Sequence, residues 1–284
     1  MVSSSIDPNR HATMADVETA MIDLLARDDS VMAQAARHHL GSGGGRARAK
    51  LALQSAHALN LSFATTRAIS AACELLHNAS LVHDDLQDGD TVRRGETAVW
   101  KKFGSNTAIC LGDLMVSAAY AAIASAPVDQ LTEMIAHMHQ RVSDVIGGQH
   151  ADLESDCTTI ADYNDVARMK SGPLLGLPVE LCLIAANRQA DVSAAMTASD
   201  AIAIAYQTTD DISDAECDIA VGGLNFLALV QGEMASRAHA ARQHAADFAR
   251  SAITIAKNLP DGSGDGLVAL AEKFVPVLEI GEAA

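Results

Sequence analysis

The chain has 284 residues, of which 49% are hydrophobic and only 3% aromatic, and its formal net charge is −16. This charge argues against a nucleic-acid-binding protein, because phosphate binding needs a basic face. The apolar fraction is enough for a sizeable core, and a core built from Ala, Leu, Ile, Val and Met favours closely packed helices. Five dispersed cysteines without a CxxC pair predict reduced thiols and a cytoplasmic location.

The predicted elements are helices from one end of the chain to the other. Residues 1–13 are expected to form a flexible tail without the apolar segment of a signal peptide. Thr13 and Asp16 then predict a capping box at the start of the first helix. Further predicted helices cover about 65–87, 106–125, 129–146 and 191–214. Breaks are predicted at the Gly-rich segments 41–45, 147–148 and 221–225, and at "KSGP", residues 170–173.

No segment alternates polar and apolar residues as a half-buried strand would, and no composition shift marks a domain boundary. No apolar run reaches the ~18 residues of a transmembrane helix. The sequence therefore predicts one all-α domain over residues 14–284, with about ten or more helices and no transmembrane segment.

The segment "LVHDDLQDGD", residues 81–90, gathers acids directly after an apolar run. Asp84 and Asp88 are four residues apart, so both lie on one face of a continuing helix, with Asp85 beside them. A polar helix end is the simpler interpretation, but carboxylates there repel one another and oppose the helix dipole. A divalent cation explains the cluster better. Oxygen ligands select Mg²⁺ or Ca²⁺, and Mg²⁺ commonly combines one or two carboxylates with substrate phosphates.

A second cluster repeats the pattern in "YQTTDDISD", with Asp210, Asp211 and Asp214 again closing an apolar run. After the first cluster, "TVRRGE" adds Arg93 and Arg94, whose planar guanidinium groups suit phosphate oxygens. The alternative is that these arginines neutralise Asp88 and Asp90. Metal ligands and arginines in one region predict a diphosphate site.

These segments resemble the trans-isoprenyl diphosphate synthase (polyprenyl synthetase) family. The resemblance covers most of the chain and rests on five segments in the family's order: "LLHNASLVHDDLQDGDTVRRG", "GDLM", "GGQHADLE", "MKSGPLL" and "YQTTDDISD". It implies an all-α fold around a central cavity, Mg²⁺ bound by both aspartate clusters, and a homodimer. The implied reaction is a prenyl transfer, in which isopentenyl diphosphate attacks the cation formed from an allylic diphosphate.

The family pattern also implies roles for individual residues. Arg93, Lys170 and Gln207 would contact the allylic diphosphate, and the catalytic set would comprise Asp84, Asp88, Arg93, Lys170 and Asp210. The isopentenyl diphosphate site would be formed by Arg46, Arg48, His77 and Arg94. For Lys170 the alternative is a solvated surface lysine, and for His77 a satisfied core histidine.

Two positions depart from the family pattern. "GGGRARA" places Gly45 where the family has a lysine, and "DIAVGGLN" places Gly223 at a second family lysine and Asn225 at a threonine. These losses keep three alternatives open: a terpene cyclase, a prenyltransferase acting on another acceptor, or a non-catalytic partner subunit of a heteromeric synthase.

Product length in this family depends on the depth of the cavity behind the first cluster. Ser80 lies one helical turn before Asp84, with Ala79 beside it. Small residues there leave room beyond fifteen carbons. The predicted substrates are therefore isopentenyl diphosphate with dimethylallyl, geranyl or farnesyl diphosphate, and the predicted product is geranylgeranyl diphosphate, with longer chains left open.

Overall fold

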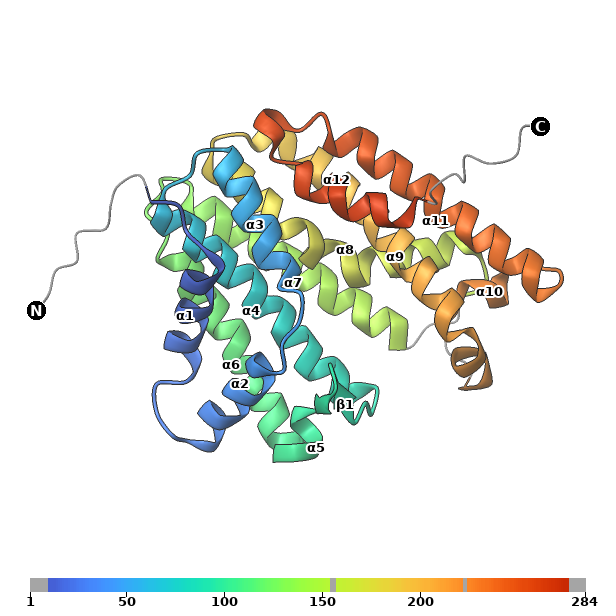
Figure 1. The fold of residues 1–284 in the computed structure, drawn as a ribbon, viewed down its shortest axis with the longest axis horizontal. Helices are drawn as coiled ribbons and strands as arrows, with labels where there is room; N and C mark the ends of the chain where they lie inside the picture. The colour runs from blue at the N-terminus through green and yellow to red at the C-terminus, as the bar shows by residue number, and fades with distance from the viewer. Residues whose placement is uncertain (1–9, 154–156, 222–223, 276–284) are drawn as a thin grey trace, which may run out of the picture. The chain divides into compact units, whose positions relative to one another are not determined.

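The structure is a computed structural model that describes the backbone of residues 10–153, 157–221 and 224–275, and the side chains of these residues except 214–221. Within these ranges it contains twelve α-helices, three short 3-10 helices and one hairpin of two strands, each two residues long (Figure 1). The predicted all-α class is confirmed. The chain forms two compact units: unit 1 comprises Met1–His139 and Leu177–Gln189, and unit 2 comprises Gln140–Gly176 and Ala190–Ala284.

Unit 1 contains the first six helices, the hairpin, the start of α7 (Leu131–Leu153) and the end of α8 (Ile160–Ala185). The elements are α1 (Met14–Leu25), α2 (Val31–Gly41), α3 (Ala47–Ala58), α4 (Phe63–Gln87), β1 (Val92–Arg93), β2 (Glu96–Thr97), α5 (Val99–Phe103) and α6 (Ser105–Ala124). The predicted capping box between Thr13 and Asp16 is present at the start of α1. The Gly-rich segment 41–45 separates α2 from α3, as predicted.

Helix α4 is the central helix of unit 1. It packs against α1, α3 and α6, and in Figure 1 it runs alongside α3 and α6. Its buried face is largely small and aliphatic, so neighbouring helices approach closely without aromatic residues. Buried members include Ile69, Leu75, Leu76 and Val82, and burying each such side chain contributes about 1.5–3 kcal/mol. This helix fixes the position of the first aspartate-rich segment at its C-terminal end.

Two predicted helix breaks are wrong. Helix α7 (Leu131–Leu153) continues through Gly147 and Gly148, and α8 (Ile160–Ala185) continues through the segment 170–173. A Cβ on Gly148 would overlap the backbone of Met169, so this glycine lets α7 approach α8 closely. A Cβ on Gly172 would likewise overlap the carboxylate of Asp200. These glycines serve helix packing, which outweighs their weak helix propensity.

Unit 2 contains the second half of α7, most of α8, and the remaining helices. These are η1 (Gln189–Asp191, in part), α9 (Val192–Val221), α10 (Phe226–Leu229), α11 (Met234–Ala256), η2 (Pro260–Gly262), α12 (Asp265–Ala271) and η3 (Glu272–Phe274). Helix α9 packs against α10, α11 and α12. Tyr163, Ile204 and Phe226 belong to one buried cluster that joins α8, α9 and α10.

Among the described helices, α6 alone has the length and apolar composition that would allow it to cross a membrane. The window concerned has a mean hydropathy of 1.6, and 44% of it is buried inside the protein. A core helix can have the same length and composition, so the predicted absence of a transmembrane segment stays a prediction.

Candidate functional site

The first aspartate-rich segment forms the C-terminal end of α4. The backbone N–H of Asp88, the C-terminal cap, donates to the carbonyl oxygen of Asp84 at 2.8 Å. Asp84 is half-buried and Asp88 is exposed. The two residues therefore stand one turn apart at a negatively polarised helix end, as the sequence predicted.

Asp85, between them in sequence, is buried at 1% exposure and pairs with Arg93. Its Oδ1 accepts a hydrogen bond from Nε of Arg93 at 2.6 Å, and Nη2 of Arg93 also lies 3.2 Å from Oδ2 of Asp90. Burial raises the pKa of Asp85 although Arg93 opposes the shift. Arg93 thus pairs with Asp90, as the alternative interpretation expected, and also with Asp85, which that interpretation did not name. Its contact with a diphosphate, and metal binding by Asp85, stay predictions.

Two arginines converge on the Gly-rich loop between α2 and α3. Nη1 of Arg94 donates to the carbonyl oxygen of Gly43 at 2.6 Å, and Nη1 of Arg46 donates to the same oxygen at 3.2 Å. A Cβ on Gly44 would overlap the Arg94 guanidinium, and the positive φ of Gly44 (+109°) also favours glycine. Burial lowers the pKa of Arg94, and the charge of Arg46 lowers it further. The loop therefore holds two like charges close together.

His77 lies on α4, two turns before Asp84. Its Nε2 lies 3.4 Å from Nη1 of Arg48, and because a guanidinium only donates, Nε2 is the acceptor. Burial lowers the pKa of His77 well below its usual value, and the charges of Arg48 and Arg94 add to this shift. The structure thus places the residues predicted to bind isopentenyl diphosphate around the Gly-rich loop and α4. These residues are Arg46, Arg48, His77 and Arg94.

A buried polar chain that the sequence analysis missed connects α2, α4 and α3. Nε2 of His39 donates to Oδ1 of Asn78 at 3.1 Å, and Nδ2 of Asn78 donates to Oε1 of Glu74 at 3.2 Å. Oε2 of Glu74 accepts from the backbone N–H of Ala49 at 3.1 Å. Glu74 is an acid inside the apolar run "ISAACELL". This acid in an otherwise buried helix was the signal that could have revealed the chain.

The burial of His39 predicts that the free energy of unfolding depends on pH. Burial, followed by the charge of Arg94, lowers the pKa of His39 from 6.5 to about 4. The unfolded chain therefore binds more protons than the folded chain between these values, and stability is lost as pH falls from 6.5 towards 4. We expect the protonation of His39 to lower the free energy of unfolding by about 2 kcal/mol when the pH falls from 7.5 to 5. Urea unfolding of the wild type and of His39→Gln, which keeps a donor for Asn78, measures it. Equal pH dependence in both proteins would contradict the prediction.

The second aspartate-rich segment lies on α9. Asp210 is exposed, whereas Asp211 is buried at 2% exposure. Oδ2 of Asp211 accepts from the Tyr163 hydroxyl at 2.8 Å and from the backbone N–H of Phe226 at 2.7 Å. Its Oδ1 accepts from Nε2 of Gln207 at 3.0 Å. Asp211 therefore binds α8, α9 and α10 together, and its role as a metal ligand stays a prediction. The side chain of Asp214 lies outside the described residues, as does Gly223.

Asn225, which stands at the threonine position of the family pattern, has a structural role. Its side chain caps α10 by accepting from the N–H of Leu227 at 2.9 Å, and it donates to the carbonyl oxygen of Asp211 at 3.0 Å. The residue is 1% exposed. An amide supplies both the acceptor and the donor that this position uses.

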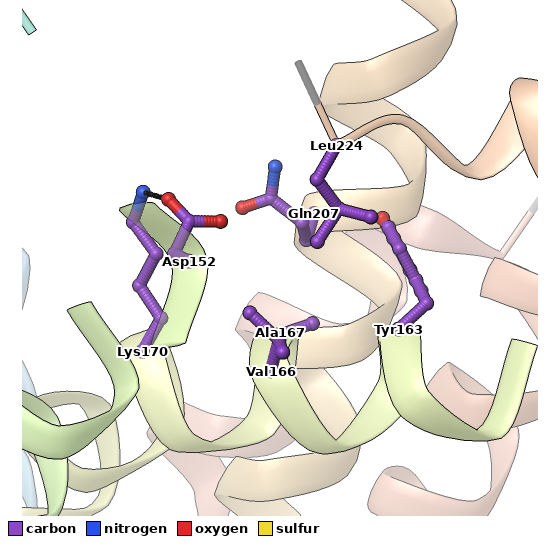
Figure 2. Close-up of a pocket in the computed structure, with 7 residues that line it drawn as sticks. All are labelled: Asp152, Tyr163, Val166, Ala167, Lys170, Gln207 and Leu224. Atoms are coloured by element: carbon purple, nitrogen blue, oxygen red, sulfur yellow. Dashed lines mark hydrogen bonds and ion pairs between the residues drawn. The ribbon is translucent and has the colours of Figure 1, made fainter. Parts of the chain in front are cut away.

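Lys170 and Gln207 line a pocket in unit 2, together with Asp152, Tyr163, Val166, Ala167 and Leu224 (Figure 2). Nζ of Lys170 donates to Oδ2 of Asp152 at 2.5 Å. In Figure 2 the amide of Gln207 points towards this ion pair. Lys170 is therefore a pocket residue rather than a solvated surface lysine. Asp152 belongs to "GGQHADLE", yet the sequence analysis gave it no role. Tyr163 left no signal in the sequence.

The carboxylates at the end of α4 are suitable ligands for Mg²⁺. Among the described side chains, no three of Asp, Glu, His or Cys gather closely enough to hold a metal by themselves. Mg²⁺ does not require such a cage, because it binds one or two carboxylates and completes its shell with phosphate and water. Oδ2 of Asp85 is buried and receives no hydrogen bond from the described part of the chain. Such an oxygen normally has a partner, and a cation at this end of α4 would supply one.

The predicted chain-length residues lie one turn before the acids on α4. Ala79 is 2% exposed, and Ser80 is half-buried with its hydroxyl donating to the carbonyl oxygen of His77 at 2.9 Å. Both side chains are small, and the Ser80 hydroxyl is satisfied by its own helix. Their effect on product length stays a prediction.

Comparisons with known proteins found a family model and several relatives. The model of the family described as "Polyprenyl synthetase" matches residues 29–228. The "Geranylgeranyl pyrophosphate synthase" of Geoglobus acetivorans is 30% identical over 187 residues, which are 64% of this chain and 59% of that protein. The "Probable farnesyl diphosphate synthase" of Sinorhizobium fredii is 35% identical over 223 residues, 73% of this chain and 67% of that protein. The match thus spans about three fifths to two thirds of these relatives.

Solved structures share the fold. The geranylgeranyl pyrophosphate synthetase of Geoglobus acetivorans matches with a TM-score of 0.80 at 23% identity, covering 91% of this chain and 94% of that one. The polyprenyl synthase of Caulobacter crescentus, solved with calcium and isoprenyl diphosphate, matches with a TM-score of 0.81 at 20% identity and covers 94% and 98%. The family model covers more than half of the sequence, and it includes both aspartate-rich segments and the residues around them. The chain therefore belongs to the polyprenyl synthetase family.

Proposed function

We propose that the protein is a Mg²⁺-dependent prenyltransferase that condenses isopentenyl diphosphate with an allylic diphosphate. The observation that carries this proposal lies in unit 1. There, α4 presents two carboxylates at its end and, about 10 Å earlier along the helix, a histidine beside three arginines. The cationic side chains suit diphosphate oxygens, and the neighbouring carboxylates suit a hard cation. Together they match the chemistry of two diphosphate substrates.

The reaction breaks the C1–O bond of the allylic diphosphate, and the diphosphate leaves with the electron pair. The double bond of isopentenyl diphosphate then attacks the allylic cation, a new C–C bond forms, and a proton leaves, with the departed diphosphate as its acceptor. Asp84 and Asp88 in unit 1, and Asp210 in unit 2, are the residues that would hold Mg²⁺, which when bound would supply Lewis-acid stabilisation of the leaving oxygens. Arg46, Arg48, Arg94 and neutral His77 hold isopentenyl diphosphate. In this scheme Lys170 exchanges Asp152 for the allylic diphosphate, with Gln207 beside it.

One assay tests the function and its alternatives. Purified protein is incubated with Mg²⁺ and dimethylallyl, geranyl or farnesyl diphosphate, with and without isopentenyl diphosphate, and products are identified by mass spectrometry. Elongation requires isopentenyl diphosphate. A cyclase product forms without it, and a partner subunit alone forms no product; either result would overturn the proposal. The homodimer and the cytoplasmic location stay predictions, although the four described cysteines are all free thiols.

We propose geranylgeranyl diphosphate as the main product, and Ser80→Phe tests the length assignment. A phenyl ring one turn before Asp84 would occupy the space expected for the growing chain, so we expect the main product to shorten to fifteen carbons or fewer. Mass spectrometry of the product mixture measures the change. Phe replacing Ala124, at the far end of α6, is the control and should leave the profile unchanged. An unaltered profile for Ser80→Phe would refute the assignment.

Gly45→Lys tests the consequence of the missing lysine. Gly45 has no positive φ, and a Cβ there meets nothing within 4 Å, so a lysine fits without strain. An added cation beside the arginine loop should lower the KM for isopentenyl diphosphate about three- to tenfold. Gly41→Lys, at an equally open position on α2, is the matched control. A higher KM in Gly45→Lys would show that the loop does not bind this substrate as proposed.

A further inference from the structure

The N-terminus of α3 is capped by a distant residue. The helix follows Arg46, which has a left-handed backbone conformation (φ 49°). The side chain of Arg46 makes no capping hydrogen bond. The first N–H groups of a helix have no partner inside it, and a neighbouring Ser, Thr, Asp or Asn usually accepts one of them. Here the N–H of Ala49 donates to Oε2 of Glu74 on α4 at 3.1 Å. A buried carboxylate 25 residues further along the chain thus replaces the local cap.

The same carboxylate is a counter-charge for the arginine loop. Oε1 of Glu74 lies 4.0 Å from Nη1 of Arg46. The charge of Glu74 also raises the pKa of Arg94, whereas Arg46 lowers it. Nη2 of Arg46 donates to the carbonyl oxygen of Leu40 at 2.6 Å, so this guanidinium joins the end of α2 to the loop. Without Glu74, two neighbouring cations would repel each other at the start of a helix that has lost its cap.

The position of Glu74 is fixed from the other side by Asn78. The amide nitrogen of Asn78 donates both to the carbonyl oxygen of Glu74 at 2.7 Å and to Oε1 at 3.2 Å, while His39 occupies the amide oxygen. Glu74 and Asn78 are both 0% exposed. The carboxylate therefore has a single orientation, and it cannot touch a substrate directly.

We infer that Glu74 is a positioning residue for diphosphate binding: it holds the first turn of α3 and the Arg46 guanidinium so that Arg48, Arg94 and His77 meet the diphosphate of isopentenyl diphosphate. This inference rests on the proposed function. Its distinguishing consequence is selectivity between substrates. Loss of Glu74 weakens binding of isopentenyl diphosphate but leaves the allylic substrate, assigned to other residues, unaffected.

Glu74→Gln is the decisive variant because it keeps the size of the side chain and an acceptor for the Ala49 N–H while removing the charge. We expect the dissociation constant for isopentenyl diphosphate, measured by calorimetry on the full chain, to rise about tenfold. Its KM should rise similarly, and the KM for the allylic diphosphate should stay within twofold. Glu74→Ala, which also removes the cap, should have the larger effect.

Glu180→Gln is the matched control. Glu180 is also 0% exposed and belongs to unit 1, but its Oε2 accepts from Nε2 of His137 on α7 at 2.7 Å. The affinity of the Glu180→Gln variant for isopentenyl diphosphate should stay within twofold of that of the wild type. Equal rises for both substrates in Glu74→Gln, an equal effect in Glu180→Gln, or failure of Glu74→Gln to fold would each overturn the inference in favour of a general structural role.

The outcome separates this inference from the proposed function. If the wild type binds isopentenyl diphosphate but forms no elongated product, the proposed function fails, and the binding comparison still tests Glu74. If the wild type elongates and Glu74→Gln keeps full affinity, only the inference about Glu74 fails.

Discussion

Asp84→Asn should lower the rate of chain elongation about 10²- to 10³-fold and leave the fold intact. Asp84 is half-buried at the end of α4, where the charge of its carboxylate opposes the helix dipole. An amide oxygen fits the same space but binds a hard cation weakly without the negative charge. The measurements are kcat at saturating substrates, the Mg²⁺ concentration that gives half-maximal rate, and the melting temperature.

Asp85→Asn is the comparison for stability alone, because it makes the same chemical change at the next residue. Asp85 is buried and paired with Arg93, so its replacement should lower the free energy of unfolding by about 2 kcal/mol. Asp84→Asn should leave the free energy of unfolding within ~0.5 kcal/mol of the wild type. Undiminished elongation by Asp84→Asn would exclude this carboxylate from metal binding.

Asp211→Asn should be the most destabilising single substitution considered, at about 3–5 kcal/mol. The carboxylate accepts three hydrogen bonds, from Tyr163, Phe226 and Gln207, at 2% exposure. Asparagine replaces one acceptor oxygen with a donor, so at least one of these buried donors would face an N–H group. Urea unfolding at pH 7 measures the loss.

Asp210→Asn is the matched comparison for stability, since Asp210 is the exposed neighbour on the same helix. It should change the free energy of unfolding by less than ~0.5 kcal/mol while lowering the elongation rate. If Asp210→Asn proved as destabilising as Asp211→Asn, the structural role assigned to Asp211 would be wrong.

The two aspartate-rich segments share an arrangement that the motif letters do not reveal. In each, the second aspartate is buried and bound by protein donors: Asp85 by Arg93, and Asp211 by Tyr163, Phe226 and Gln207. The first aspartate of each segment, Asp84 or Asp210, is more exposed. Successive residues of an α-helix differ by about 100° in direction, so adjacent identical side chains face different surroundings. The sequence identified the segments but could not assign different roles within them.

Helix packing similarly decided the helix boundaries that the sequence analysis missed. Gly148 and Gly172 were interpreted as breaks because glycine weakens an isolated helix. In the structure each occurs inside a helix, where a Cβ would overlap a neighbouring backbone or carboxylate. A propensity cost of about 1 kcal/mol is small beside the packing of a long buried helix.

By itself, the sequence determined the all-α class, the capping box of α1 and the positions of both aspartate-rich segments, because periodicity and residue spacing are local properties. Through its resemblance to the family, it also indicated the arginines and the histidine that gather around the Gly-rich loop. Only the tertiary structure revealed Glu74 as the cap of α3, Asp152 as the partner of Lys170, and Asp211 as the anchor of three helices. Each of these contacts joins residues far apart in the chain, and no local pattern records which distant donor a buried carboxylate will meet.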